Sequence, residues 1–219
     1  MNKTFIILSI CIMASLTGCS QQGKQPKVFG ESPLNLENFD FNLNIKTFIP
    51  EKYLQEYGWY HIPANGGKVM VVRDTIYWEH INDRLFVEKT PENAKWLLFS
   101  DRGNTTDDYL AKYGEFPFLH IQFAVSLDNE IMAVHTQTPE WDKDTNDNFV
   151  QLLTSKYAHY QSETGERLFS KYEKYTWKLN DRIIYYWAYH NEDETQYQGS
   201  FYIYKKEFAD KISNVFENE

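Results

Sequence analysis

Cysteine is nearly absent from this sequence of 219 residues. The two that occur, Cys11 and Cys19, both lie within the first 19 positions. The chain after Ser20 therefore has no disulfide framework, no thiolate metal site and no cysteine nucleophile. Its fold must depend on an ordinary hydrophobic core, and 15 Phe, 16 Tyr and 6 Trp residues supply ample apolar surface for one.

Long apolar runs and familiar catalytic motifs are missing as well. The apolar run Phe5–Leu16 covers 12 residues, whereas a membrane-spanning helix needs roughly 20. There is no Gly-rich phosphate loop, no G-x-S-x-G and no H-E-x-x-H, and the isolated pair Gly66-Gly67 is typical of a turn. No cofactor is expected from these patterns.

Positive charge is also scarce. The chain has 22 Lys and Arg against 31 Asp and Glu, a net charge of −9. Removing the first 18 residues would take away Lys3 and leave −10. A body this acidic repels phosphate backbones and gains nothing electrostatically from an anionic lipid surface. We therefore expect no nucleic-acid partner.

The N-terminus is the most informative region that is present. Lys3, the apolar run and the small residues after it are typical of a secretory signal. The next residues, Leu16-Thr17-Gly18-Cys19, resemble the lipobox of bacterial lipoproteins. The resemblance covers about the first 19 residues and implies cleavage before Cys19, a diacylglyceryl group on its sulfur and an acyl chain such as palmitate on its amine. The alternative is a plain signal peptide with a chance cysteine.

The same resemblance implies a location. Ser20 follows the cysteine where an aspartate would favour retention at the inner membrane. By similarity with enterobacterial lipoproteins, this favours the outer membrane of a Gram-negative host, on the periplasmic side or the cell surface. Several acyl chains hold a protein firmly at a membrane without spanning it.

The domain organisation expected is a signal peptide over residues 1–18, a lipidated tether over 19–33 and a globular body over 34–219. The tether is polar and contains Gly and Pro with no sustained period. The length of the body fits one domain. If it consists of two packed halves, residues 139–146 are where it would divide.

Turn signals between β-branched and aromatic runs predict hairpins. They occur at Asn82-Asp83, Asp128-Asn129 and Asn180-Asp181. A two-residue turn at the last would pair Trp177 with Ile184 and Tyr175 with Tyr186. Further strands are predicted from Lys68, Thr75, Arg84, Lys95 and Ser200. The expected fold class is α+β, with mainly antiparallel sheet built from hairpins and three to four helices packed against it.

The helices are predicted from a recurring phrase. "YLQEYGWY" from Tyr53 and "YLAKYGEF" from Tyr109 each place a glycine where a left-handed residue would end a helix. A third helix is expected to open at Asp144 or Asn146 and to run to Tyr157, and a fourth covers residues 205–216. The segment Asp142–Asn148 begins like a calcium loop but has Asp147 at the glycine position, so a capped helix is the simpler interpretation.

The hairpin at Asp128-Asn129 would create a polar patch. Gln122 would lie opposite His135, and His120 opposite Gln137, all on one side of the sheet. Two histidines and two amides can bind a metal or polarise a substrate, although no spacing supplies an acidic third ligand. The alternative is the solvated face of a half-buried sheet. No metal site is predicted.

The aromatic ladder Ile183–His190 provides a second candidate. One face of the strand would carry Tyr185, Trp187 and Tyr189, beside a row of residues on the neighbouring strand: Lys174, Thr176 and Lys178. Aromatic rings between lysines suit a protein interface or stacking against sugar rings. The competing interpretation, and the commoner fate of large aromatics, is a covered core with lysines extending from its edge.

The function expected from these features is that of a non-catalytic envelope lipoprotein. Its partners would be the membrane, through the lipid, and an unknown protein, peptide or glycan. The alternative is an envelope hydrolase with a site assembled around His120 and His135.

Overall fold

The computed structural model describes these parts of the chain: 26–51, 57–61, 68–74, 94–101, 109–126, 128–158, 160–167, 170–191, 193 and 195–208. The predicted signal peptide, Cys19, the turn at Asn82-Asp83 and the strands predicted from Thr75 and Arg84 lie outside them. In the described parts, no helix combines the length and hydropathy needed to cross a membrane.

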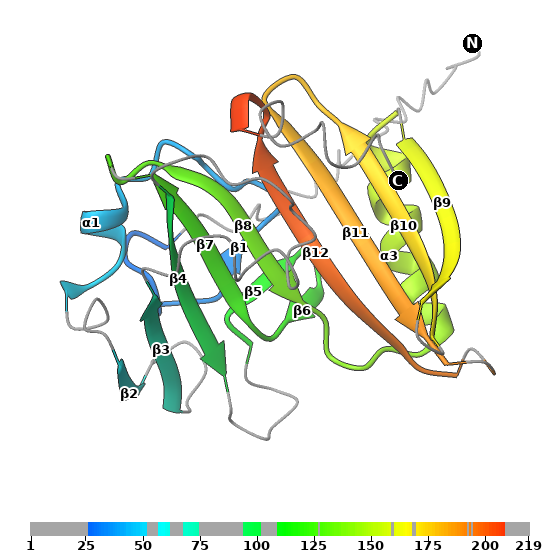
Figure 1. Cartoon of the computed structure of the whole chain (residues 1–219), viewed down its shortest axis with the longest axis horizontal. Helices are drawn as coiled ribbons and strands as arrows, with labels where there is room; N and C mark the ends of the chain where they lie inside the picture. The colour runs from blue at the N-terminus through cyan, green and yellow to red at the C-terminus, as the bar shows by residue number, and fades with distance from the viewer. Residues whose placement is uncertain are drawn as a thin grey trace, which may run out of the picture.

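About half of the described chain forms one large curved sheet (Figure 1). In these residues it has nine strands in the order β2-β3-β4-β7-β8-β12-β11-β10-β9, and every neighbouring pair is antiparallel. Their bounds are β2 Tyr57–His61, β3 Lys68–Asp74, β4 Ala94–Asp101, β7 Ile121–Ser126, β8 Ile131–Gln137, β9 Tyr160–Arg167, β10 Ser170–Lys178, β11 Arg182–His190 and β12 Tyr197–Lys205.

A smaller sheet packs beside it. It contains β1 (Leu34–Asn35), β5 (Ala111–Tyr113) and β6 (Phe116–Phe118), with β1 parallel to β5 and β5 antiparallel to β6. The expectation of mainly antiparallel sheet is therefore confirmed. The described residues contain two helices, α1 (Ile45–Phe48) and α3 (Lys143–Lys156), and a helical turn at 206–208. The expected three to four helices stay a prediction.

Two predicted hairpins are confirmed, one of them residue by residue. Strands β10 and β11 pair Trp177 with Ile184 and Tyr175 with Tyr186. Leu179 N donates to Arg182 O at 2.9 Å and closes the turn at Asn180-Asp181. Strands β7 and β8 form the other hairpin, with Asn129 at a positive φ of 69° in its turn and a register shift between Ala124 and Val125. Ser126 N donates to Glu130 O at 2.8 Å, so the turn is longer than the two residues predicted, and the shift brings Gln122 opposite His135 as expected.

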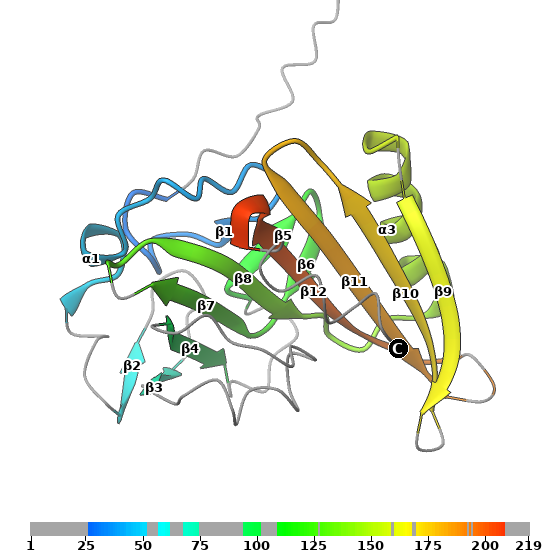
Figure 2. The same cartoon turned by 45° about the horizontal axis from the view of Figure 1, so that its top comes forward.

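Helix α3 covers one face of the large sheet, which we call the inner face; in Figure 2 it runs alongside β9 and β10. Its N-cap is Asp142, whose carboxylate accepts from Thr145 N at 2.7 Å. The helix therefore begins just before the predicted Asp144, and the capped-helix interpretation of this segment is correct. Phe149 points into the core, with ring centroids 5.0 Å from Tyr186 and 5.5 Å from Phe201.

The predicted tether is too long. Phe29, which falls inside it, is 3% exposed, and its ring lies 6.0 Å from those of Phe48 and Phe123. Its backbone N also donates to Phe48 O at 2.7 Å. The segment was predicted to be a tether because its composition is polar, but its single phenylalanine packs into the core. The folded body therefore already includes Phe29. The large sheet continues from β8 to β12, and residues 139–146 lie between β8 and the rest of the chain that forms α3 and β9 to β12.

Neither of the two glycines expected to end a helix does so, because both lie in or between strands. Gly58 lies within β2. Gly114 does adopt a left-handed φ of 57°, but it turns β5 back into β6. Leu110, Ala111 and Tyr113 are all buried, because β5 is paired on both sides by β1 and β6. Pairing with distant strands overrode a weak local helix preference.

Candidate functional site

The face opposite α3, here called the outer face, carries the predicted aromatic row. Lys174 pairs with Trp187 and Thr176 with Tyr185 between β10 and β11. Tyr189 pairs with Tyr172, which was not among the predicted binding residues. Tyr172 lies two residues before Lys174 on the same strand, so the alternation of side chains places both on this face.

Four half-buried side chains on this face form what we call the aromatic patch: Tyr172, Lys174, Trp187 and Tyr189. The Trp187 ring lies 5.7 Å from Tyr172 in a stacked arrangement and 5.9 Å from Tyr189 in an edge arrangement. Lys174 Nζ lies over the Trp187 ring, 5.3 Å from its centroid. A cation over an indole face is stabilising. The patch is therefore an ordered cluster with rings that still reach the surface.

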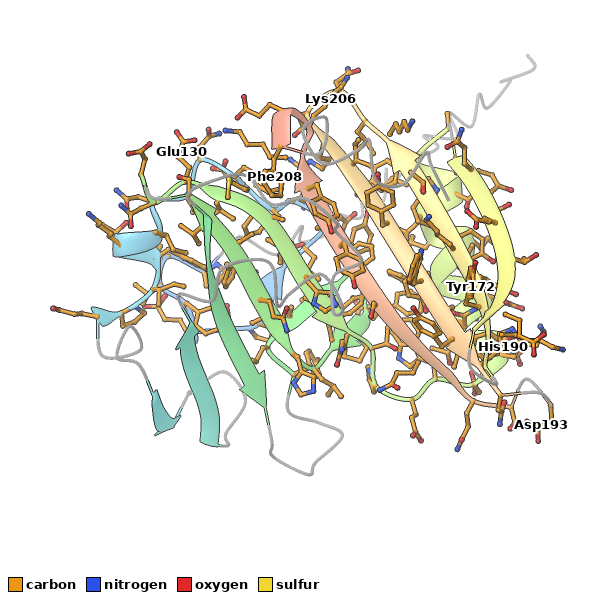
Figure 3. The ribbon with its side chains drawn as sticks, viewed as in Figure 1. Glu130, Tyr172, His190, Asp193, Lys206 and Phe208 are labelled. Carbon is orange, nitrogen blue, oxygen red and sulfur yellow. The ribbon has the colours of Figure 1, made fainter. Side chains whose placement is uncertain are left out.

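The patch extends to the edge of the sheet. Tyr172 lies on β10 close to the edge strand β9 (Figure 3). A Cβ added to Gly165 on β9 would overlap the Tyr172 hydroxyl. Glycine at 165 therefore lets the Tyr172 side chain cross the neighbouring strand, and the patch reaches the margin of the sheet.

Two other residues of the predicted row, Tyr185 and Thr176, are buried. Tyr185 is 7% exposed, and its ring meets that of Tyr204 at 5.5 Å. Burial raises the pKa of the hydroxyls of Tyr202 and Tyr204 on the adjacent strand. The core interpretation is thus correct for Tyr185, while Trp187 and Tyr189 remain half-buried. Lys178 lies apart from the patch, exposed beside a shallow hollow that it lines with Gln161 and Thr176.

The polar patch is only partly as predicted. Gln122 does lie opposite His135, and His135 Nδ1 is 3.1 Å from Gln122 Oε1. The imidazole is 3% exposed and stacks on Tyr202 with centroids 4.3 Å apart. This part of the face is buried, whereas both interpretations of the patch required access to solvent or substrate. His120 and Gln137 are half-buried at the ends of their strands.

The chemistry of His135 follows from its burial. Desolvation, with a smaller contribution from nearby His120, lowers the pKa of the His135 imidazole to about 3. Because the amide oxygen of Gln122 only accepts, Nδ1 donates and Nε2 carries the lone pair. Nε2 is buried and has no hydrogen-bond partner among the residues that the structure describes. Proton transfer at neutral pH works best with a pKa near 7, so this geometry favours a structural role.

Metal binding has no support from the described side chains. Among those residues, no group of three His, Cys, Asp or Glu is placed to hold an ion. Comparison with known proteins brings no further guide to the site, because no family model, no curated protein and no solved structure matches the chain. Its function has to be argued from its own geometry.

Proposed function

We propose that this protein is a non-catalytic binding protein of the cell envelope, tethered by lipid on Cys19, and that the aromatic patch is where its partner docks. The observation that supports binding is the ordered cluster of Tyr172, Trp187 and Tyr189 around Lys174. Aromatic rings with one polar end, held on a rigid sheet, are enriched in protein interfaces. The tether rests on the lipobox resemblance, which favours the outer membrane.

The partner is a protein, a peptide or a glycan, and the packing favours the first two. Sugar stacking requires an open ring face. Tyr172 and Lys174 already lie against the Trp187 ring, which leaves less of it for a sugar. A polypeptide can instead use the ring edges and the lysine together. The hydrolase alternative has little support, given the buried imidazole of His135.

The test compares two aromatic truncations in the full lipidated protein. Trp187→Ala should reduce the amount of envelope partner retained on immobilised protein at least tenfold, because interface aromatics commonly contribute 2 kcal/mol or more, roughly a thirtyfold change. Tyr160→Ala is the matched control, since Tyr160 is 48% exposed on the same sheet but faces Trp177.

Stability separates this result from misfolding. Trp187→Ala should cost clearly less unfolding free energy than Trp177→Ala, which empties a fully buried site and should cost about 3–5 kcal/mol. Capture is measured below the melting temperature of every variant. Equal retention by the parent, Trp187→Ala and Tyr160→Ala would contradict the proposal.

A further inference from the structure

The described chain enters the fold on the inner face of the large sheet. Pro26, the first described residue, is buried. Three residues later, the Phe29 ring lies 6.0 Å from those of Phe48 in α1 and Phe123 in β7. Phe29 N also donates to Phe48 O at 2.7 Å. Packing and a backbone hydrogen bond therefore fix the entry point to α1 and β7.

The entry point and the aromatic patch lie on opposite faces of the sheet. Directly paired residues of neighbouring strands share a face. The row of pairs that begins at Phe123 continues through β8 and β12 to Ile184 on β11. Trp187 lies three residues beyond Ile184, so its side chain is on the other face. Figures 1 and 2 also show α1 at one end of the large sheet and β9 at the other.

The link from this entry point to the proposed lipid is short. Seven residue steps separate Cys19 from Pro26. An extended chain spans at most about 3.6 Å per residue, which limits the link to about 25 Å. A flexible chain of this length has an average end-to-end distance of only ~15 Å. The entry point is therefore held near the membrane surface.

Turning the outer face toward the bilayer would use all of this reach. Packed layers lie about 10 Å apart, so the entry point is separated in depth from the tips of the outer side chains by about 15 Å. The link would also have to pass an end of β7, and half the length of this six-residue strand is about 10 Å. Together these distances equal the fully extended link, a conformation with little entropy.

The surface around the entry point suits contact with lipid headgroups but not insertion between them. Phe29, Ile45 and Phe48 are buried in the core, whereas Lys27 and Lys46 are exposed. No large apolar side chain of the described residues 26–51 is exposed. The orientation of the body at the membrane therefore depends on the link, because this surface offers lipid no apolar area to bury.

We infer that the short link holds the inner side of the fold, around Pro26 and α1, toward the bilayer and directs the aromatic patch into the aqueous compartment. The inference rests on the proposed lipid at Cys19 and deepens the proposed role of the patch. In this orientation the patch is open to water-soluble polypeptides and turned away from lipid headgroups and from membrane-embedded segments. The partner that docks on Trp187 is therefore a soluble protein or peptide.

Single-cysteine labels test the orientation, since the chain after Ser20 contains no cysteine. The lipidated mature protein is reconstituted on phosphatidylcholine vesicles with and without nitroxide on the headgroups. A fluorophore is attached at Lys46→Cys on α1 or at Gln198→Cys, which is exposed on the outer face opposite Tyr189. Headgroup nitroxides should quench the label at position 46 several-fold more than the label at position 198, because they act only at short range.

A longer link provides the matched control. Inserting about thirty Gly and Ser residues between Gly23 and Lys24 raises the average reach to roughly 35 Å, so the body can turn freely. The two labels should then be quenched to similar extents. A preference for position 46 that persists with the long link would overturn the inference, because something other than the link would set the orientation.

Two further results would overturn it, and they have different meanings. Quenching at position 198 that equals or exceeds quenching at position 46 would show that the orientation is wrong, while leaving the aromatic patch as a binding site. Protein that does not float with the vesicles in a density gradient would show that the lipid anchor of the proposed function is absent. Circular dichroism confirms that each labelled variant is folded.

Discussion

The pKa of the His135 imidazole lies far below the usual value for histidine because of its surroundings. Its ring is stacked on Tyr202, bonded to Gln122 at Nδ1 and 3% exposed. Burial holds the pKa of the imidazole at about 3, whereas the ordinary value is 6.5. The folded protein therefore keeps this ring neutral at a pH where the unfolded chain takes up a proton.

Stability should consequently fall as the pH drops below about 6.5. Between the two pKa values the imidazole is protonated in the unfolded chain but not in the folded protein, so proton binding stabilises the unfolded state. For this one group, the free energy of unfolding should be about 2 kcal/mol lower at pH 5 than at pH 7.5. Urea unfolding at both pH values measures the loss. His135→Gln, which keeps a polar partner for Gln122, should remove most of this difference. An unchanged pH dependence in the variant would show that other groups cause it.

Residue-scale prediction from the sequence worked where local alternation was sufficient. It placed Trp187, Tyr189 and Lys174 on one face and Gln122 opposite His135. It failed to decide burial. Tyr185 is core and Trp187 is half-buried although both occupy equivalent positions on β11, because exposure depends on what lies over each point of the sheet.

At the scale of elements, a buried hydrogen bond joins α3 to the sheet. Tyr186 OH donates to Asn146 Oδ1 at 2.7 Å, and both residues are fully buried. A Cβ on Gly199 would overlap the Tyr186 ring, so glycine there leaves room for the tyrosine beneath the helix. A hydrogen bond shielded from water specifies one position of the helix more strictly than apolar contacts do.

Tyr186→Phe should cost about 1–2 kcal/mol of unfolding free energy, because it leaves the buried amide oxygen of Asn146 without its donor. Tyr175→Phe is the matched control. Tyr175 OH donates to Glu173 at 2.7 Å in a half-buried setting where water can replace it, so the loss should be smaller. Chemical denaturation of the three proteins measures both values. Equal losses of unfolding free energy in the two variants would mean that the buried hydrogen bond to Asn146 stabilises the protein no more than the half-buried one to Glu173.

Elements were predictable to different degrees for a physical reason. Hairpins at Asp128-Asn129 and Asn180-Asp181 and the helix after Asp142 are specified by neighbouring residues through turns and caps. The segment around Gly114 is a strand because β1 and β6 pair with it. Helix-like spacing in eight residues is too weak to resist such pairing.

At the scale of the whole molecule, a short link joins the predicted lipid at Cys19 to a body that begins by Phe29. With the proposed lipid on Cys19, such a link would keep the body close to the bilayer. Cys19→Ala should move the protein from the membrane fraction to the soluble fraction, because the acyl chains provide its hold on the membrane. Cys11→Ala, in the predicted signal peptide, is the control and should leave the protein with the membranes.

Fractionation after a high-salt wash measures this difference. Material that still sediments with membranes after Cys19→Ala would show that another part of the molecule anchors it. Release of both variants would show that the predicted signal, rather than the lipid, had been disturbed.

The sequence alone determined the features that depend on neighbours along the chain: the lipobox resemblance, the two hairpins, the register of β10 with β11 and the helix after Asp142. Only the tertiary structure decided that β12 lies between β8 and β11, that Phe29 belongs to the core, and that β9 is an edge. Strand order comes from contacts between residues far apart in the sequence, and no local pattern encodes them. For the same reason, the sequence identified the rows of side chains, whereas the folded sheet decided which side chains were buried and which stayed partly exposed.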